Sequence, residues 1–255
     1  MSTLAVANQK GGVGKTTTAV NVAAYLALGV PVLLVDLDPQ ANATSSLGFD
    51  PNGVELSTYD GLIGSAPLQA AIVSSGRAQL DLAPASRALA GAQVELVDMP
   101  DRERRLEAAL REVRQQYAVV IIDTPPSIGI LTLNALVAAD LLLAPVQCEY
   151  LALEGVAQLM ETIDLVRATL NPRLELLGMV MTMYDPRTRL SPQVVEEVRR
   201  HFPERTFETV IPRSVRLSEA PSYGKPVVEY EPTSRGASAY ADLAQELIRR
   251  GLLRA

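Results

Sequence analysis

Short apolar runs alternate with longer amphipathic stretches along this chain, and the alternation predicts an α/β sheet. The apolar runs are rich in β-branched residues and carry few polar positions, which is typical of strands buried on both faces. We expect strands over residues 4–7, 32–35, 119–122, 141–146, 176–181 and 207–211. Strands that alternate with helices imply a mostly parallel sheet with helices on both faces.

The amphipathic stretches between these runs predict the helices. We expect helices over residues 19–28, 102–116, 153–170, 191 to about 201, and 237–248. Ser191 and Pro192 are interpreted as the N-cap and the first-turn proline of their helix. Residues 49–90 are the least regular part, where we expect a partly helical excursion. The predicted fold is thus α/β, with a twisted, mostly parallel sheet of about seven to eight strands.

Composition narrows the class of protein. The chain has 255 residues without a Pro-, Gly- or Ser-rich linker or a repeat, so residues 1–255 are predicted to form a single domain. No stretch is long enough to span a bilayer, and a strand predicted almost at Met1 leaves no room for a signal peptide. Cys148 is the only cysteine, which excludes an internal disulfide or a cysteine metal cage and favours a reducing cytoplasm.

Residues 8–18, with the sequence NQKGGVGKTTT, carry the strongest chemical signal. They lie between the first predicted strand and a helix. Glycines let consecutive backbone N–H groups point inward as a nest for phosphate oxygens, and the positive end of the helix points to the same place. Lys15 can reach the β- and γ-phosphates, and Thr16 can supply a hydroxyl to Mg²⁺. This context predicts a site for a nucleoside triphosphate.

The loop departs from the ordinary phosphate-loop pattern, G-x-x-x-x-G-K-[ST]. Gln9 stands where the first glycine belongs, and Lys10 follows it. Lys10 and Lys15 place two ammonium groups on one loop that already attracts anions. Such a pair is unfavourable unless a highly charged anion lies between the two, so the departure itself favours a bound triphosphate.

Two other predicted strands end in carboxylates. Asp36 and Asp38 follow the strand at 32–35, and Asp123 follows the strand at 119–122. Ligands bind outside the carboxyl ends of strands in open α/β sheets, so these groups are expected near the phosphate loop. Asp123 has the Walker B arrangement, and Asp38 can orient or activate the attacking water. Asp36 can instead cap a helix or pair with the loop lysine. The expected magnesium ligands are Thr16, Asp38 and Asp123.

These residues resemble the deviant Walker A family of ATPases and, more narrowly, the chromosomal ParA/Soj partition proteins. The resemblance rests on the motifs at residues 10–17, 36–40 and 122–126, and on the segments at residues 145–155, 182–188 and 210–221. It covers nearly the whole chain. Ser214 departs from the family pattern, since relatives often carry Asn there.

The resemblance implies a slow, Mg²⁺-dependent ATP hydrolase that binds ATP between two chains. Lys10 would be the signature lysine, which reaches across a two-fold axis to the nucleotide of the other subunit, while Lys15 holds the nucleotide of its own. Asp38 would correspond to the hydrolysis residue whose replacement traps the ATP dimer. The implied nucleotide contacts, the last three of them around the adenine, are Lys10, Gly11, Gly12, Val13, Gly14, Lys15, Thr16, Thr17, Met183, Pro212 and Arg213.

The resemblance also implies that the ATP dimer binds double-stranded DNA non-specifically on the nucleoid. A ParB-like centromere-binding partner would stimulate hydrolysis through a basic N-terminal peptide. The net charge of −6 opposes contact with phosphates, but a global charge does not decide a local field. The implied DNA contacts are Arg187, Arg189, Arg213 and Arg216. Alternatively, arginines of this region are solvated or pair with nearby glutamates, namely Glu196, Glu197, Glu204 and Glu219.

Other functions are weighed against this one. A MinD-like membrane switch that positions cell division needs a C-terminal amphipathic helix, but residues 247–255 are short and broken by Gly251. An iron–sulfur reductase needs more cysteines than Cys148, and an ATP-dependent ligase needs a substrate pocket that the sequence does not reveal. A plasmid-type partition protein usually has an N-terminal extension before the first strand. We therefore expect a chromosomal partition ATPase in the cytoplasm, without stable membrane binding.

Overall fold

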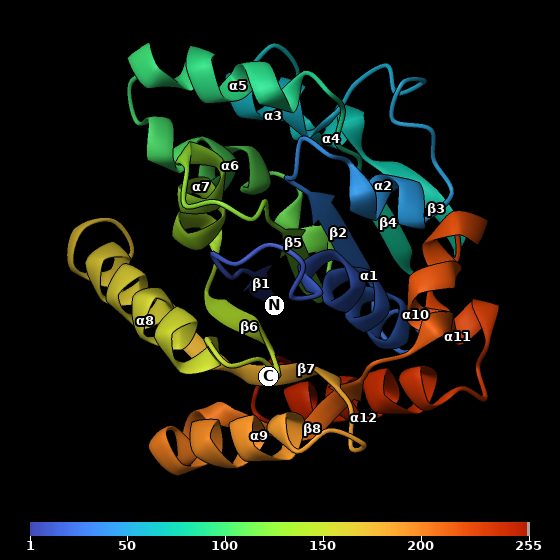
Figure 1. Ribbon diagram of the computed structural model, residues 1–255. Coiled ribbons are helices and arrows are strands. Elements are labelled where there is room, and N and C mark those ends of the chain that lie inside the picture. Colours follow the sequence, from blue (N-terminus) through green and yellow to red (C-terminus); the bar gives the residue numbers. More distant parts are fainter. Residues whose placement is uncertain (254–255) are drawn as a thin grey trace.

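All six predicted strands form, and they lie side by side in one sheet (Figure 1). The computed structural model describes residues 1–253. The sheet has eight strands in the order β3-β4-β2-β5-β1-β6-β7-β8. Neighbouring strands are parallel except in the β3–β4 hairpin. The strands are β1 (Ser2–Val6), β2 (Val32–Asp36), β3 (Val73–Arg77), β4 (Leu80–Ala83), β5 (Val119–Asp123), β6 (Leu141–Gln147), β7 (Glu175–Tyr184) and β8 (Thr206–Pro212). The predicted fold class is confirmed.

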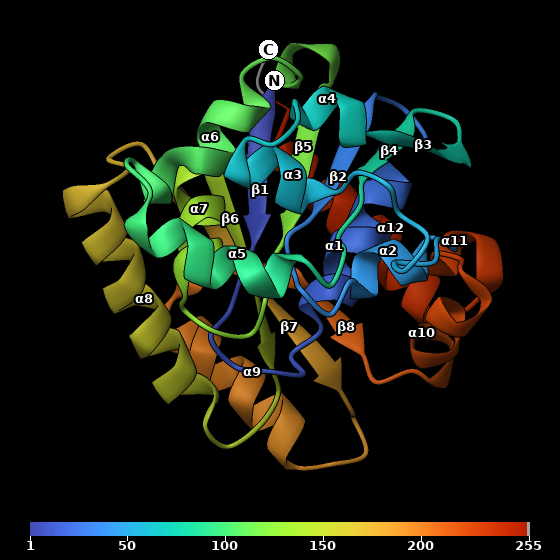
Figure 2. The same ribbon diagram turned by 90° about the horizontal axis from the view of Figure 1, so that it is seen from above.

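Helices cover both faces of the sheet (Figure 2). One face packs against α1 (Lys15–Leu26), α2 (Asn42–Ser46), α10 (Val215–Glu219), α11 (Val227–Tyr230) and α12 (Arg235–Arg249). The other packs against α3 (Thr58–Ile63), α4 (Leu68–Ala71), α5 (Leu89–Glu95), α6 (Arg105–Leu110), α7 (Ile130–Ala138), α8 (Ala152–Thr169) and α9 (Leu190–His201). Within residues 1–253, none of these helices has the length and apolar character needed to cross a bilayer.

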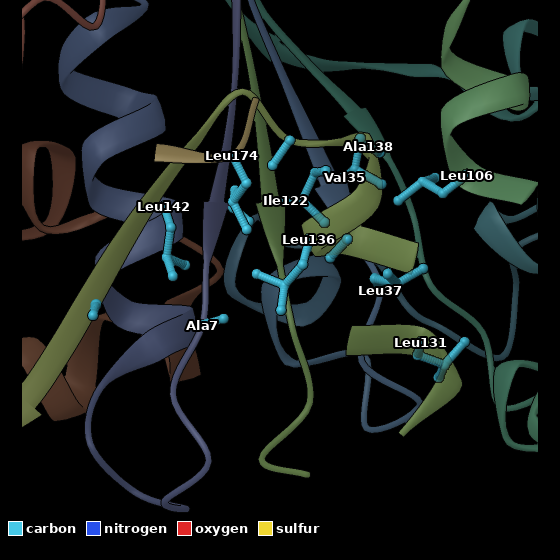
Figure 3. Packing of buried hydrophobic residues seen from close by; sticks show 14 of the residues in the cluster. Ala7, Val35, Leu37, Leu106, Ile122, Leu131, Leu136, Ala138, Leu142 and Leu174 are labelled. Carbon is cyan, nitrogen blue, oxygen red and sulfur yellow. The ribbon is translucent and has the colours of Figure 1, made fainter. Parts of the chain in front are cut away.

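Successive residues of the central strands enter two separate cores. In β5, Val119 and Ile121 pack with α1 and α12, whereas Val120 and Ile122 pack with the helices of the other face. Figure 3 shows Ile122 among side chains of neighbouring strands and of α7. Burial on both faces explains why these strands are continuous apolar runs rather than alternating ones.

The helix predicted over residues 102–116 is wrong. A 3₁₀ turn precedes α6, and a second one follows at Arg114–Gln116. The side-chain amide of Asn134 enters the helical ladder: its Oδ1 accepts from the N–H of Leu106 at 3.0 Å, and its Nδ2 donates to the carbonyl of Arg102 at 2.7 Å. Those two backbone groups would bond to each other in a continuous helix.

The start of α9 also differs from the prediction. The helix begins at Leu190, so Ser191 is its second residue and not its N-cap. The hydroxyl of Thr188 accepts from the N–H of Ser191 at 3.3 Å, which satisfies a backbone donor that a capping residue would otherwise satisfy. Helix α12 ends at Arg249, and Gly251 follows in a left-handed conformation. Arg254 and Ala255, which end the predicted C-terminal segment, lie outside the described residues.

Several elements have no counterpart in the prediction, among them the short helices α2, α10 and α11. Residues 49–90 are partly helical, as expected, but they also form the β3–β4 hairpin, which adds two strands to the sheet. Helix α7 was not predicted either. It is almost uniformly apolar and largely buried, so it lacks the polar face from which a helix is recognised.

The edge strand β8 is closed by side chains. Its pairing with β7 matches Met179 with Thr206 but Met181 with Val210, so β8 carries a bulge. The N–H groups of Glu208 and Thr209 donate to the two carboxylate oxygens of Glu246 at 2.9 and 3.0 Å. Glu246, on α12, is 4% exposed and also pairs with Arg250. The backbone donors at the bulge of the edge strand are thereby satisfied within the chain.

We expect Glu246→Gln to lower the free energy of unfolding in urea by about 1–3 kcal/mol, because an amide group then faces a backbone N–H. Burial alone would raise the pKa of Glu246, but hydrogen bonds from Thr209 and Glu208 outweigh it and leave the pKa lowered. The ionised carboxylate of Glu246 therefore stabilises the folded protein at pH values above the ordinary glutamate pKa. This stabilisation is lost as the pH falls through the lowered pKa of the folded state. Glu196→Gln, at a side chain that is 74% exposed, is the control and should change stability by less than about 0.5 kcal/mol.

Candidate functional site

The glycine-rich loop follows β1 and ends in α1, as predicted. Helix α1 begins at Lys15 and not at residue 19, so Thr16 and Thr17 belong to its first turn. Gly12 and Gly14 have φ values of 73° and 90°, which a residue with a side chain rarely adopts. Gly14 is the N-cap and supplies no side-chain cap, so the first N–H groups of α1 remain available to an anion.

Polar side chains from neighbouring elements hold this loop. The amide of Asn8 donates to the carbonyl of Pro145 at 2.7 Å and accepts from the N–H of Lys10 at 3.0 Å. The hydroxyl of Thr182 donates to the carbonyl of Val13 at 2.8 Å. Sequence reasoning assigned no role to Asn8 or Thr182. The available signal was a polar residue just after a predicted strand: Asn8 follows β1, and Thr182 lies near the end of β7, which only the sheet order of the structure places two strands from β1.

The two loop lysines have different partners. Lys15 is buried, and its Nζ donates to the carbonyl of Lys10 at 3.0 Å. Burial lowers the pKa of Lys15, and the charges of Asp123 and Asp38 partly offset that effect. Lys10 is half-exposed, and its Nζ lies 2.6 Å from Oε2 of Glu149. Glu149 thus balances the charge of Lys10 within the chain, a partner that the sequence pattern does not reveal.

Strand register brings two of the predicted carboxylates together. Asp36 ends β2 directly beside Asp123 at the end of β5. Oδ2 of Asp36 accepts from the N–H and the hydroxyl of Thr44, at 2.8 and 2.7 Å. Asp36 therefore anchors α2, the capping alternative left open above. Burial raises the pKa of Asp36 to about 6, although the bonds from Thr44 act against the rise. Asp38 is also buried, and its Oδ1 accepts from the N–H of Gln40.

Asp123 is the buried carboxylate that lacks hydrogen bonds. Neither of its oxygens has a partner among residues 1–253. Burial and the charge of Asp36 raise its pKa well above the ordinary value, while Thr16 and Lys15 lower it. An unpartnered carboxylate beside the hydroxyl of Thr16 fits Mg²⁺, which is commonly bound by one or two carboxylates together with waters and substrate phosphates. In the described part of the chain, no three acidic, His or Cys side chains form a metal cage.

A cavity of about 270 Å³ opens next to the loop. It lies between Gly14 and Thr17 on one side and the predicted adenine contacts Met183, Pro212 and Arg213 on the other. Ser214 lines it as well. Met183 has a φ of 52°, an unusual value for a side chain of this size, and such strain is concentrated at functional sites. Two segments that are distant in the sequence, at residues 182–183 and 211–214, thus line the same cavity.

The four predicted DNA-contacting arginines lie on segments that follow β7 and β8. The N–H of Arg213 donates to the carbonyl of Tyr184, which joins the two segments. Arg187 pairs with Asp185 at 2.7 Å, and Arg216 pairs with Glu219 at 2.8 Å. The alternative of pairing with the named glutamates therefore holds for Arg216 and for Arg200, which pairs with Glu196 and Glu197, whereas the partner of Arg187 is an aspartate outside that set. These pairs are solvent-exposed and contribute little to stability.

Comparison with known proteins agrees with this geometry. A protein-family model described as an AAA domain matches residues 1–176. The sporulation initiation inhibitor protein Soj of Bacillus subtilis (strain 168) is 53% identical over 249 residues, covering 97% of this chain and 98% of its own. The chromosome-partitioning ATPase Soj of Thermus thermophilus is 54% identical over 248 residues, covering 97% and 95%.

Solved structures show the same fold. The crystal structure of cobyrinic acid a,c-diamide synthase from Mycobacterium smegmatis with bound ADP and magnesium has a TM-score of 0.86 and 42% identity, covering 98% of this chain and 94% of that chain. The two Soj proteins are more similar in sequence, and the likeness extends over nearly the full length of both chains. This protein therefore belongs to the Soj/ParA family of chromosome-partitioning ATPases.

Proposed function

We propose that residues 1–255 act as one ATPase domain that switches between a free chain and an ATP-bound dimer attached to DNA. The observation that carries the proposal is the placement of Lys15, Asp38 and Asp123 around a glycine-rich loop with free helix N–H groups. Such a site binds a triphosphate and its metal. The Soj relatives support chromosome segregation as the process, and we place the protein in the cytoplasm, on the nucleoid.

The proposed nucleotide site uses the loop and the adjacent cavity. Residues 10–17, with Lys15 among them, would bind the phosphates of ATP. Met183, Pro212 and Arg213 would surround the adenine. Thr16, Asp123 and Asp38 would hold Mg²⁺, which supplies charge neutralisation to the phosphates when it is bound. Asp38 would orient the attacking water. What supports the metal assignment is the unpartnered, buried carboxylate of Asp123.

The proposed dimer is built on Lys10. Its ammonium would leave Glu149 and contact the phosphates of the nucleotide in the other subunit, so that ATP bridges two surfaces that otherwise repel each other. Lys10 would act in catalysis in this way, together with Lys15 and Asp38. The proposal is supported by the half-exposed position of the Lys10–Glu149 pair, because a pair that is open to solvent is separated at little cost in free energy.

The ATP dimer would bind double-stranded DNA through backbone phosphates, with Arg187, Arg189, Arg213 and Arg216 as the proposed contacts. Arg189 and Arg213 have no ion-pair partner within residues 1–253, whereas Arg187 and Arg216 would exchange a carboxylate for a phosphate. Binding should be indifferent to sequence and strongly weakened by salt. A ParB-like centromere-binding protein would stimulate hydrolysis and release the DNA.

Retention of non-specific DNA with ATP, ADP or no nucleotide tests the switch. We expect retention only with ATP, and Asp38→Ala should keep it while reducing hydrolysis by at least about 100-fold, because the water is no longer oriented. Asp50→Ala, which removes an acid elsewhere, serves as the control. DNA retention that is equal in all three nucleotide states would contradict the switch, and normal hydrolysis by Asp38→Ala would contradict the role of Asp38. Flotation with liposomes in the presence of ATP would reveal the MinD-like alternative.

A further inference from the structure

The end of β2 is attached to a short helix through a strained residue. Asp36 binds Thr44 of α2 through two hydrogen bonds, and Asp38 lies between this anchor and the start of the helix. Ala41, the N-cap of α2, is buried with a φ of 52°. A non-glycine residue keeps this conformation only when its surroundings impose it. The position of α2 relative to β2 therefore depends on the contacts that hold Ala41 in this conformation.

The other end of α2 contacts the segment after α10 without side chains between them. Gly48 follows α2, and Gly224 follows the 3₁₀ turn Ala220–Tyr223. A Cβ added to Gly224 would lie 2.6 Å from Cα of Gly48, so the two backbones are in direct contact. A contact of this kind has no flexible side chain to absorb a shift. Helix α2 contacts the turn Ala220–Tyr223, which follows α10, and Figures 1 and 2 show α2 on the side of the molecule where α10 lies.

Arg77 cross-links this contact. Its guanidinium donates to the carbonyl of Leu47 at 3.1 Å, to the carbonyl of Gly224 at 2.9 Å, and to both oxygens of Glu229 on α11. The side chain is 17% exposed. A planar guanidinium that bonds several groups at once fixes their relative positions. Arg77 therefore joins the end of α2 to α11 and to the turn that precedes it.

The same turn holds the side chain of Arg216. Tyr223, next to Gly224, stacks on Tyr230 with ring centroids 4.9 Å apart. The hydroxyl of Tyr230 donates to Glu219 at 3.1 Å, and Arg216 donates to the same oxygen at 2.8 Å. A displacement of Gly224 thus changes the support of Arg216, one of the proposed DNA contacts.

We propose that Arg77 and the Gly48–Gly224 contact link the nucleotide site to the DNA-binding segment, so that the position of α2 sets the DNA affinity through Arg216. Arg77 is a positioning residue in this scheme, since it lies on β3 and touches neither the phosphate loop nor its carboxylates. The inference rests on the proposed DNA binding. Through these contacts, Asp36 and Asp38 at the end of β2 would influence the surface that carries Arg216.

Two variants break the link in different ways. Arg77→Gln removes the guanidinium that bonds Leu47, Gly224 and Glu229 at once. Gly224→Ala forces the backbones of residues 48 and 224 apart. We expect each to lower the ratio of DNA association constants measured with ATP and with ADP by about tenfold, which lies within the range of ordinary coupling between sites. ATP affinity without DNA should change by less than about threefold, because the nucleotide site is intact. A structural role alone would weaken binding equally with both nucleotides.

Matched controls separate the link from general damage. Arg105→Gln removes another partly buried guanidinium that donates to backbone carbonyls, those of Leu62 and Ile63. Gly251→Ala imposes the same left-handed strain where no neighbouring atom would meet the new Cβ. Both should keep the ATP-over-ADP ratio of the unsubstituted protein. Glu229→Gln removes only the charge that pairs with Arg77, and it is the substitute variant if Gly224→Ala does not fold.

Amide hydrogen exchange of residues 215–224 tests the link without DNA. In the unsubstituted protein, ATP with Mg²⁺ should change the protection of this segment relative to ADP, and Arg77→Gln should lose that change. The link is overturned if ATP leaves the segment unaltered, or if Arg77→Gln and Gly224→Ala keep the full response. If the exchange results are as expected but DNA is retained in no nucleotide state, the proposed DNA binding fails, and only the coupling between the nucleotide site and residues 215–224 stands.

Discussion

Asp123→Asn should stabilise the nucleotide-free protein and nearly abolish its Mg²⁺-dependent ATPase activity. Both carboxylate oxygens are buried without a hydrogen-bond partner among residues 1–253, next to the carboxylate of Asp36. A neutral amide of the same shape relieves this repulsion and can donate to Asp36, so the free energy of unfolding should rise by roughly 1–3 kcal/mol. The same change removes a proposed magnesium ligand, and the hydrolysis rate should fall by at least about 100-fold.

The pH dependence of unfolding provides a sharper test of this prediction. The folded protein raises the pKa of Asp123, mainly by burial, so ionisation of this group works against folding as the pH rises above about 4. The advantage of Asp123→Asn should therefore be small in acid and widen toward neutral pH. Asp36→Asn is the control with the opposite sign, because Asp36 accepts hydrogen bonds from Thr44 that an amide cannot fully replace. Destabilisation by Asp123→Asn, or an unchanged ATPase rate, would refute the assignment.

Lys10→Gln should abolish ATP-dependent dimerisation and reduce hydrolysis by at least about 100-fold, because the cation that would bridge two subunits is absent. ATP should still bind the single chain within a few-fold, since Lys15 and the N–H groups of α1 remain. The stability of the free protein should change by no more than about 1 kcal/mol, because the pair of Lys10 with Glu149 is half-exposed.

Light scattering with ATP measures the dimer, and titration calorimetry measures nucleotide binding. Lys225→Gln is a matched control, since it removes the one lysine outside the loop and makes the same change in net charge. A Lys10→Gln protein that dimerises with ATP as the unsubstituted chain does would show that this lysine is not the bridge.

The strands and the location of the site were predictable from sequence because both follow from strong local patterns. Strands buried on both faces are continuous apolar runs, and residues that follow parallel strands meet at one edge of the sheet. That rule was enough to expect Asp36, Asp38 and Asp123 near the loop. The register that sets Asp36 beside Asp123 depends on β2 and β5 being neighbours, which the sequence order does not specify.

What could not be predicted depends on contacts between distant segments. The amide of Asn134 interrupts the helix expected over residues 102–116, and Glu149 balances Lys10 from a loop far along the chain. Neither pairing leaves a local pattern. By contrast, the pair of Arg187 with Asp185 joins residues two positions apart, and its proximity in the sequence was available but was not used.

The closed edge at β8 bears on how copies of this protein meet. An open edge strand recruits other strands and leads to aggregates that do not dissociate. With the N–H groups of Glu208 and Thr209 bonded to Glu246, and the carbonyls of Phe207 and Glu208 bonded to Arg199, β8 offers no such template. Contact between copies is thereby directed away from sheet extension at β8, one of the two edges of the sheet. In the proposed cycle, in which copies assemble with ATP and separate after hydrolysis, occupied backbone groups at β8 would keep the dimer from growing by strand addition at that edge.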